Sequence, residues 1–293
     1  MVSITASEVP TAKLHGYLLG AVGPRPIAFA STIDDRNRPN LSPFSFFNVF
    51  GSNPPILIFS PSRRVRDNST KHTLENVLKN REVVINVVNY DMVQQMSLAS
   101  TEYMEGENEF IKSGLTMLPS DLVKPFRVAE SPVQFECRVV KVEPLGKEGG
   151  AGNLIFSEVL KIHVDADILD ENGAIDQFKI DQVARMGGNW YSRANMGLFE
   201  VPKPVSNLGI GVDQIPEHIR LSNVLTGNDL GMLGNMEKLP SQEEVRQYVD
   251  TNVDLRSILS SGDEALLHAR AQELLKNKDV LSAWKVLLAE MPT

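Results

Sequence analysis

Larger and small residues alternate along residues 27–34, which is the period-two pattern of an extended strand. The alternating sets are Ile27, Phe29, Ser31 and Ile33 on one face, and Ala28, Ala30, Thr32 and Asp34 on the other. Turn-forming polar residues occupy 34–39, and a second extended run begins at Asn40. The pattern predicts a β-hairpin with one apolar face and one face of small side chains. Either a flat ligand lies against the face of small side chains, or the hairpin is an ordinary one whose serine and threonine hydroxyl groups face water.

Four later runs rich in β-branched and aromatic residues predict further strands. They span residues 55–60, 82–88, 133–143 and 154–164. Helical spacing of apolar residues interrupts them after Thr73 and before Leu98. An antiparallel barrel decorated by short helices fits this order better than alternating strand and helix units. The predicted fold class is therefore mainly β with α.

The composition changes in the last third of the chain. Residues 201–207 are typical of an extended, proline-stiffened linker. A capping box formed by Ser241 and Glu244 predicts a helix, and Asp263 and Asp279 are candidate N-caps of two more. The apolar faces of these helices must be covered by the barrel, a second subunit or a partner. We therefore predict a barrel domain at 1–198 and an acidic linker and helical extension at 199–293.

Charge and cysteine content narrow the functional class. A formal net charge of -8 and a pI near 5.3 argue against non-specific binding to nucleic acid or to an anionic membrane. The first residues lack a basic segment followed by an apolar one, so we expect a soluble protein of the cytoplasm. The single cysteine, Cys137, falls inside a strand pattern and is predicted to be a small core residue.

Two short segments are candidates for ligand contact. Lys71 and Thr73 lie where a helix begins, a position that favours an anion such as a cofactor phosphate. Alternatively, Lys71 is exposed to solvent and Thr73 only caps the helix. Ser60 ends the preceding strand and could supply a further donor. Arg185, Gly188 and Tyr191 could close over an aromatic ring, or could form an ordinary turn.

Other catalytic patterns are absent from the sequence. It contains no HExxH, no Walker A, no G-x-S-x-G and no pair of cysteines for a metal site. The histidines are scattered, and each is better interpreted as a surface or core residue. We therefore predict no metal site and no catalytic side chain, so that any redox chemistry would belong to a bound cofactor.

Three separated segments resemble the flavin reductase-like FMN-binding split-barrel family, of flavoredoxin type. The segments are RPIAFAST with the following NLSPFSFFN, KHTLEN at residues 71–76, and RMGGNWY at residues 185–191. They stand in the order found in that family. The resemblance covers residues 9–195, and the last third of the chain resembles no family that we can identify.

The resemblance implies a split barrel that binds FMN without a covalent bond and that forms a homodimer. It places the FMN phosphate near Lys71 and Thr73, the ring edge at the backbone amides of residues 45–48, and Ser31 and Thr32 where they orient the ring. The cofactor-binding residues that it implies are Arg25, Ser31, Thr32, Ser45, Phe46, Phe47, Asn48, Ser60, Lys71, Thr73, Arg185, Gly188 and Tyr191.

The function implied is that of an FMN-binding oxidoreductase, a flavin reductase-like enzyme that passes hydride from NADH or NADPH to flavin N5. Because the chain has no G-x-G-x-x-G fingerprint, the nicotinamide would have to stack in the flavin pocket itself. Two alternatives remain open. One is an electron carrier of flavoredoxin type with tightly bound FMN, and the other is a flavin-binding interaction protein that recruits a partner through its C-terminal tail.

Overall fold

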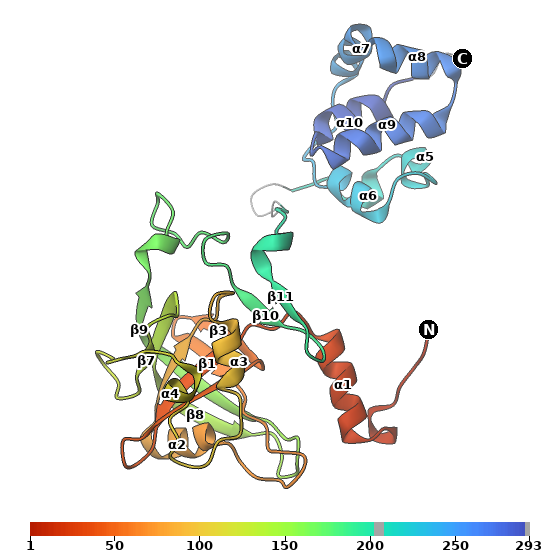
Figure 1. Cartoon of the computed structure of the whole chain (residues 1–293). Coiled ribbons are helices and arrows are strands. Elements are labelled where there is room, and N and C mark those ends of the chain that lie inside the picture. The colour runs from red at the N-terminus through yellow and green to blue at the C-terminus, as the bar shows by residue number, and fades with distance from the viewer. Residues whose placement is uncertain (202–207, 291–293) are drawn as a thin grey trace. The chain divides into compact units, whose positions relative to one another are not determined.

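The computed structural model describes residues 1–201 and 208–290. The chain divides into two compact units, Met1–Phe199 and Glu200–Thr293 (Figure 1). Within these described residues, the strands lie in the first unit, and the second contains helices and loops. Most of the predicted linker at 201–207 lies outside the described residues.

A seven-stranded antiparallel sheet forms the body of the first unit, in the order β2-β1-β5-β8-β9-β4-β3. Its strands are β1 (Ala28–Ile33), β2 (Pro39–Phe44), β3 (Phe47–Ser52), β4 (Pro55–Phe59), β5 (Glu82–Asn86), β8 (Val133–Pro144) and β9 (Asn153–Val164). The predicted mainly β fold with short helices is confirmed. The glycine-rich residues 145–152 connect β8 and β9 as a hairpin.

The connection between β2 and β3 explains why the sheet closes on itself. These two strands are the opposite edges of the sheet, yet only Ser45 and Phe46 separate them. Since consecutive Cα atoms are about 3.8 Å apart, Phe44 and Phe47 lie within about 11 Å of each other. The two edges therefore meet at this point, and the barrel is split between them. The extended run that begins at Asn40 therefore forms two strands, β2 and β3, because the chain passes from one edge of the sheet to the other at Ser45 and Phe46.

Both faces of β1 are buried. Ala28 and Ala30 face the barrel interior, where they pack with residues such as Phe44 and Cys137. Phe29 lies on the opposite face, in a second cluster with Leu41 and the helices α3 (Val93–Leu98) and α4 (Glu109–Ser113). The small face of the predicted hairpin is therefore covered by the protein itself. Burial also raises the pKa of the Cys137 thiol, which is consistent with a core residue.

Short elements surround the sheet in the first unit. The helix α1 (Thr11–Ala21) buries none of its residues, and α2 (His72–Asn80) packs Leu74 and Val77 into the barrel interior. The remaining elements are η1 (Ala6–Glu8), β6 (Met117–Leu118), β7 (Arg127–Val128), η2 (Ala166–Ile168), β10 (Val183–Arg185), β11 (Tyr191–Arg193) and η3 (Ala194–Gly197). The hairpin of β10 and β11 joins the barrel through backbone hydrogen bonds between Arg185 and Arg25.

The second unit is a helical bundle with a core of its own. Its elements are η4 (Val212–Gln214), α5 (Glu217–Arg220), α6 (Gly227–Gly234), α7 (Gln242–Thr251), α8 (Val253–Ser261), α9 (Glu264–Lys276) and α10 (Val280–Leu287). Trp284 is fully buried in this core, and its indole N–H donates to the carbonyl oxygen of Leu233 at 3.1 Å. The predicted capping box of Ser241 and Glu244 is confirmed.

One expectation about these helices is corrected. The buried parts of their apolar faces pack against one another, so the core of these helices does not depend on the barrel, a second subunit or a partner. No helix within residues 1–201 and 208–290 has the length and the apolar character that crossing a membrane requires.

Candidate functional site

A buried network of side-chain hydrogen bonds joins the β1–β2 hairpin to the start of α2. The Asn40 amide donates to the hydroxyl of Thr32 at 3.1 Å and to the hydroxyl of Thr73 at 2.9 Å. The Asn76 amide donates to Thr32 at 3.0 Å. The structure thus brings together two predicted site residues, Thr32 and Thr73, through two asparagines that sequence reasoning missed. The Thr73 hydroxyl accepts from Asn40 and keeps its own proton to donate.

A basic loop leads into α2. It carries Arg63, Arg64, Arg66 and Lys71. Arg64 Nη1 donates to the Ser69 hydroxyl at 2.8 Å and to the Thr70 carbonyl at 2.5 Å, which fixes the loop. Lys71 is the N-cap of α2, and its side chain makes no capping hydrogen bond to the helix. Uncapped amides at the positive end of the helix dipole, beside several cations, are suited to bind an anion.

One carboxylate already lies in this basic loop. Glu102, from the segment between α3 and α4, has its carboxylate 2.7 Å from Arg64 Nε, 3.3 Å from Arg66 Nη2 and 3.5 Å from Lys71 Nζ. The hydrogen bond from Arg64 is the main cause that lowers the pKa of Glu102. The loop therefore binds an anionic oxygen group within the chain itself.

Two predicted serines are buried without partners. The hydroxyl groups of Ser31 and Ser60 make no hydrogen bond to any residue that the structure describes. Ser31 shares the Phe29 face of β1, whereas Thr32 shares the Ala30 face, because successive side chains of a strand point to opposite sides. The two neighbours thus do not line one surface. Ser60 follows β4 and immediately precedes the basic loop.

The link between the sheet edges lies beside Ser60. The Ser60 amide donates to the Phe46 carbonyl at 2.9 Å. Phe46 and Asn48 are exposed, Ser45 is half-buried, and Phe47 packs partly on the barrel core. The predicted residues of this link therefore lie at the end of β4, next to one of the unpartnered hydroxyl groups.

Arg25, Arg185 and Tyr191 form a separate cluster. The Arg185 guanidinium lies 4.6 Å from the centre of the Tyr191 ring, and Gly188 between them has a φ of +57°. Arg25 is buried, and its guanidinium donates to the carbonyls of Leu19 at 2.7 Å and Met186 at 2.9 Å. Burial, with the nearby charge of Arg185, lowers the pKa of Arg25. In this structure Arg25 ties the end of α1 to the β10–β11 turn.

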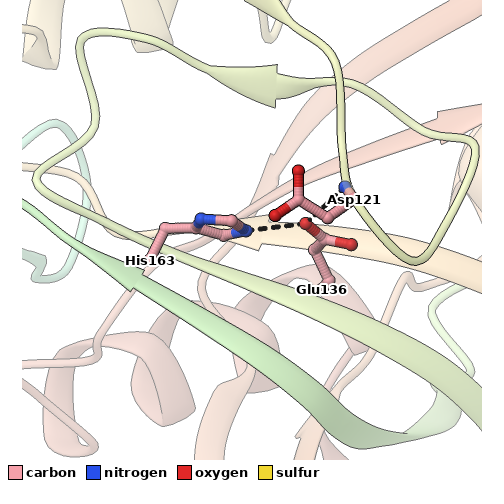
Figure 2. A group of neighbouring side chains, drawn as sticks. All are labelled: Asp121, Glu136 and His163. Atoms are coloured by element: carbon pink, nitrogen blue, oxygen red, sulfur yellow. Dashed lines mark hydrogen bonds and ion pairs between the residues drawn. The ribbon is translucent and has the colours of Figure 1, made fainter.

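A third cluster has the composition of a metal site. Asp121, Glu136 and His163 bring ligand atoms within 4.8 Å of one another (Figure 2). However, the Glu136 carboxylate accepts from the amides of Asp121, Leu122 and Val123, at 2.8, 2.6 and 3.2 Å. His163 Nε2 lies 2.6 Å from the same carboxylate, and Lys161 pairs with Asp121. These bonds use the oxygen lone pairs that a metal would need, so the cluster is a clasp that holds residues 121–123 on the sheet.

The clasp also determines the charge state of Glu136. Burial alone would raise the pKa of this carboxyl, but hydrogen bonds from the backbone amides and from His163 outweigh burial and lower its pKa. A buried carboxylate held by several N–H donors is stable as an anion. The cluster therefore contributes to the fold, and the candidate site is the region around α2, the basic loop and Ser60.

The residues of this region fit a phosphorylated cofactor such as FMN. The basic loop accepts an anionic group, α2 presents an uncapped N-terminus, and the hydroxyl of Ser60 is unpartnered. The nearby cavity of about 150 Å³, between α2 and residues 105–109, is smaller than the roughly 300 Å³ that small-molecule sites usually need. We therefore do not place the flavin ring in that cavity.

Comparison with known protein families identifies a match to one family model. The family model for the "Flavin reductase like domain" matches residues 21–179. An uncharacterized protein of Aquifex aeolicus is 40% identical over 181 residues, which cover 62% of this chain and 90% of that protein. These matches concern the barrel unit.

Solved structures agree on the fold. Nitrilotriacetate monooxygenase component B from Bacillus cereus superimposes with a TM-score of 0.65 at 25% identity, covering 69% of this chain and 98% of that chain. Flavoredoxin of Desulfovibrio vulgaris has a TM-score of 0.54 at 22% identity, covering 63% of this chain and 93% of that chain. The second likeness supports the fold alone.

Proposed function

This chain belongs to the flavin reductase like family, and we propose on that basis that it is an FMN-dependent oxidoreductase that accepts hydride from NADH or NADPH. A flavin-related oxidoreductase role follows from the family. The choice of a phosphorylated flavin over riboflavin rests on one observation, the anion-binding cluster of Arg64, Arg66 and Lys71 at the start of α2. Riboflavin has no phosphate that this cluster could bind, and the choice of FMN over FAD follows the family resemblance.

We assign phosphate binding to the basic loop and α2. Arg64 and Lys71 supply charge-assisted hydrogen bonds, and Thr73 supplies a hydroxyl proton from the buried network with Asn40. Because Asn40 and Asn76 fix the hydroxyl groups of Thr32 and Thr73, the network keeps α2 in register with the hairpin. This rigidity would hold a bound phosphate at a constant distance from the rest of the cofactor.

We assign ring contacts to residues 45–48, Ser60, Arg185 and Tyr191. The backbone amides of residues 45–48 and the hydroxyl of Ser60 would donate to the polar edge of the ring, and Arg185 with Tyr191 would cover it. When bound, the flavin supplies the two-electron redox chemistry, which no side chain of the chain needs to provide. The protein would bind, orient and shield it.

We further propose that the barrel unit works as a homodimer. Large apolar side chains are exposed on it at Phe46, Val49 and Phe50, next to the proposed ring contacts. A second copy could cover them and exclude water from the ring. Sedimentation of the purified chain tests this proposal, and a monomer at working concentrations would contradict it.

The test of the function begins with the purified protein. We expect it to be yellow or to take up added FMN, and the flavin absorbance to bleach when NADH or NADPH is added without oxygen. Heat-released cofactor, identified by chromatography, separates FMN from FAD and riboflavin. A yellow protein that neither nicotinamide bleaches would favour the flavoredoxin-type electron carrier. A colourless protein that binds no flavin would refute the proposal.

A further inference from the structure

The anion site contains a negative charge supplied by the chain. Glu102 is brought to the basic loop by the segment 99–108, which joins α3 to α4. It contacts Arg64, Arg66 and Lys71 at once. The other carboxylates near the loop are engaged locally, since Asp67 bonds Ser69 and Arg66, and Glu75 bonds Thr70. Glu102 is thus the carboxylate that reaches the site from a separate segment.

The carboxylate of Glu102 stays charged at neutral pH, because the hydrogen bond from Arg64 and the nearby cations lower its pKa. A phosphate monoester also carries close to two negative charges at neutral pH. The two anionic groups would therefore compete for the same guanidinium and ammonium donors. A phosphate could enter only if Glu102 withdrew or if both anions shared the cations, and either event weakens the binding of the phosphate.

The segment that carries Glu102 is held mainly by charge. Glu105, three residues further on, pairs with Arg38 of the β1–β2 hairpin at 2.7 Å. Met104 between the two glutamates is exposed, and the cavity of about 150 Å³ separates residues 105–109 from α2. Because residues 100–102 and 104–106 are exposed, Glu102 could leave the cations at little structural cost.

We propose that Glu102 is an internal counter-ion that competes with the flavin phosphate for Arg64, Arg66 and Lys71 and so weakens FMN binding. This inference rests on the proposed function and extends it, because a weakened phosphate site makes FMN an exchangeable substrate instead of a permanently bound group. Riboflavin, which has no phosphate, does not meet this competition. Glu102 would therefore set how strongly the protein prefers FMN over riboflavin.

The experiment compares the full-length wild type with Glu102→Gln and Glu105→Gln. The second variant is a matched control, since it removes the same charge from the same segment but from a pair with Arg38. Dissociation constants of FMN and riboflavin are measured for each protein by quenching of flavin fluorescence. We expect Glu102→Gln to bind FMN about ten-fold more tightly, equivalent to about 1.4 kcal/mol, with riboflavin changed less than about two-fold. Glu105→Gln should change the affinity for FMN by less than about two-fold, because Glu102 keeps its own ion pairs with the basic loop.

Several results would overturn the inference. Unchanged or weaker FMN binding by Glu102→Gln would show that Glu102 does not oppose the phosphate. Equal tightening of FMN and riboflavin would show a general effect on the pocket. A melting curve for each variant identifies misfolding, and in that case Glu102→Ala replaces the glutamine variant in the same comparison. Flavin binding by none of the proteins would refute the proposed function as well, whereas normal wild-type binding with an unchanged preference would refute only this inference.

Discussion

Replacement of Lys71 by alanine tests the assignment of the phosphate site most directly. Lys71 is the N-cap of α2, its side chain is 30% exposed, and its Nζ lies 3.5 Å from Glu102. A hydrogen bond to a charged group contributes roughly 1.5–3 kcal/mol. Solvent screening reduces this contribution, and so does the loss of the ion pair between Lys71 and Glu102 when phosphate binds. We therefore use the lower end of the range. We expect Lys71→Ala to weaken FMN binding about ten-fold.

The control lies on the same helix. Lys79, in the last turn of α2, is 58% exposed and pairs with Asp35 at 3.2 Å, away from the basic loop. Lys79→Ala removes the same charge and should leave FMN binding within about two-fold of the wild type. Titration of FMN and of riboflavin, each followed by fluorescence, provides the measurement. If Lys71→Ala weakened both flavins equally, or if Lys79→Ala reproduced its effect, the phosphate would not be bound at the start of α2.

Three further predictions concern the buried network, the clasp and the two units. Asn40→Ala removes the donor shared by Thr32 and Thr73 and should lower the free energy of unfolding by about 2 kcal/mol, measured in urea. The folded-state pKa of Glu136 lies below its unfolded value, so the ionised carboxylate stabilises the fold fully above the usual glutamate pKa, and this stabilisation is lost as pH falls through the lowered folded value. Glu136→Gln should therefore have a lower melting temperature than the wild type at neutral pH, and its melting temperature should fall less between about pH 6 and pH 3. Parallel curves of melting temperature against pH would contradict this. A chain that ends at Val201 should still bind FMN, because the residues assigned to the cofactor precede Phe199 and the helical unit has its own core. If this shorter protein folded but did not bind FMN, the helical unit would be part of the site.

The helical unit shows which helix starts can be predicted from the local sequence. Ser241, Asp263 and Asp279 were identifiable as N-caps, and each accepts backbone hydrogen bonds at the start of its helix. The cap of α6 was missed, although Thr226 and Asp229 form a capping box, because glycine and asparagine dominate that stretch. α8, capped by Asn252, was missed too. That these helices cover one another is a property of tertiary packing, which no single segment reveals.

The sequence by itself determined the strands β1, β2, β4, β5, β8 and β9 and the turn between β1 and β2, because alternation and turn residues act over a few positions. It also contains the three segments that carry the family resemblance. Tertiary structure alone decided that β2 and β3 become opposite edges joined by Ser45 and Phe46, and that both faces of β1 are buried. It also decided which polar groups meet. Asn40 reaches Thr73, and Glu102 reaches Lys71, across long separations in the chain, since hydrogen bonds and ion pairs depend on distance in space and not on spacing in sequence.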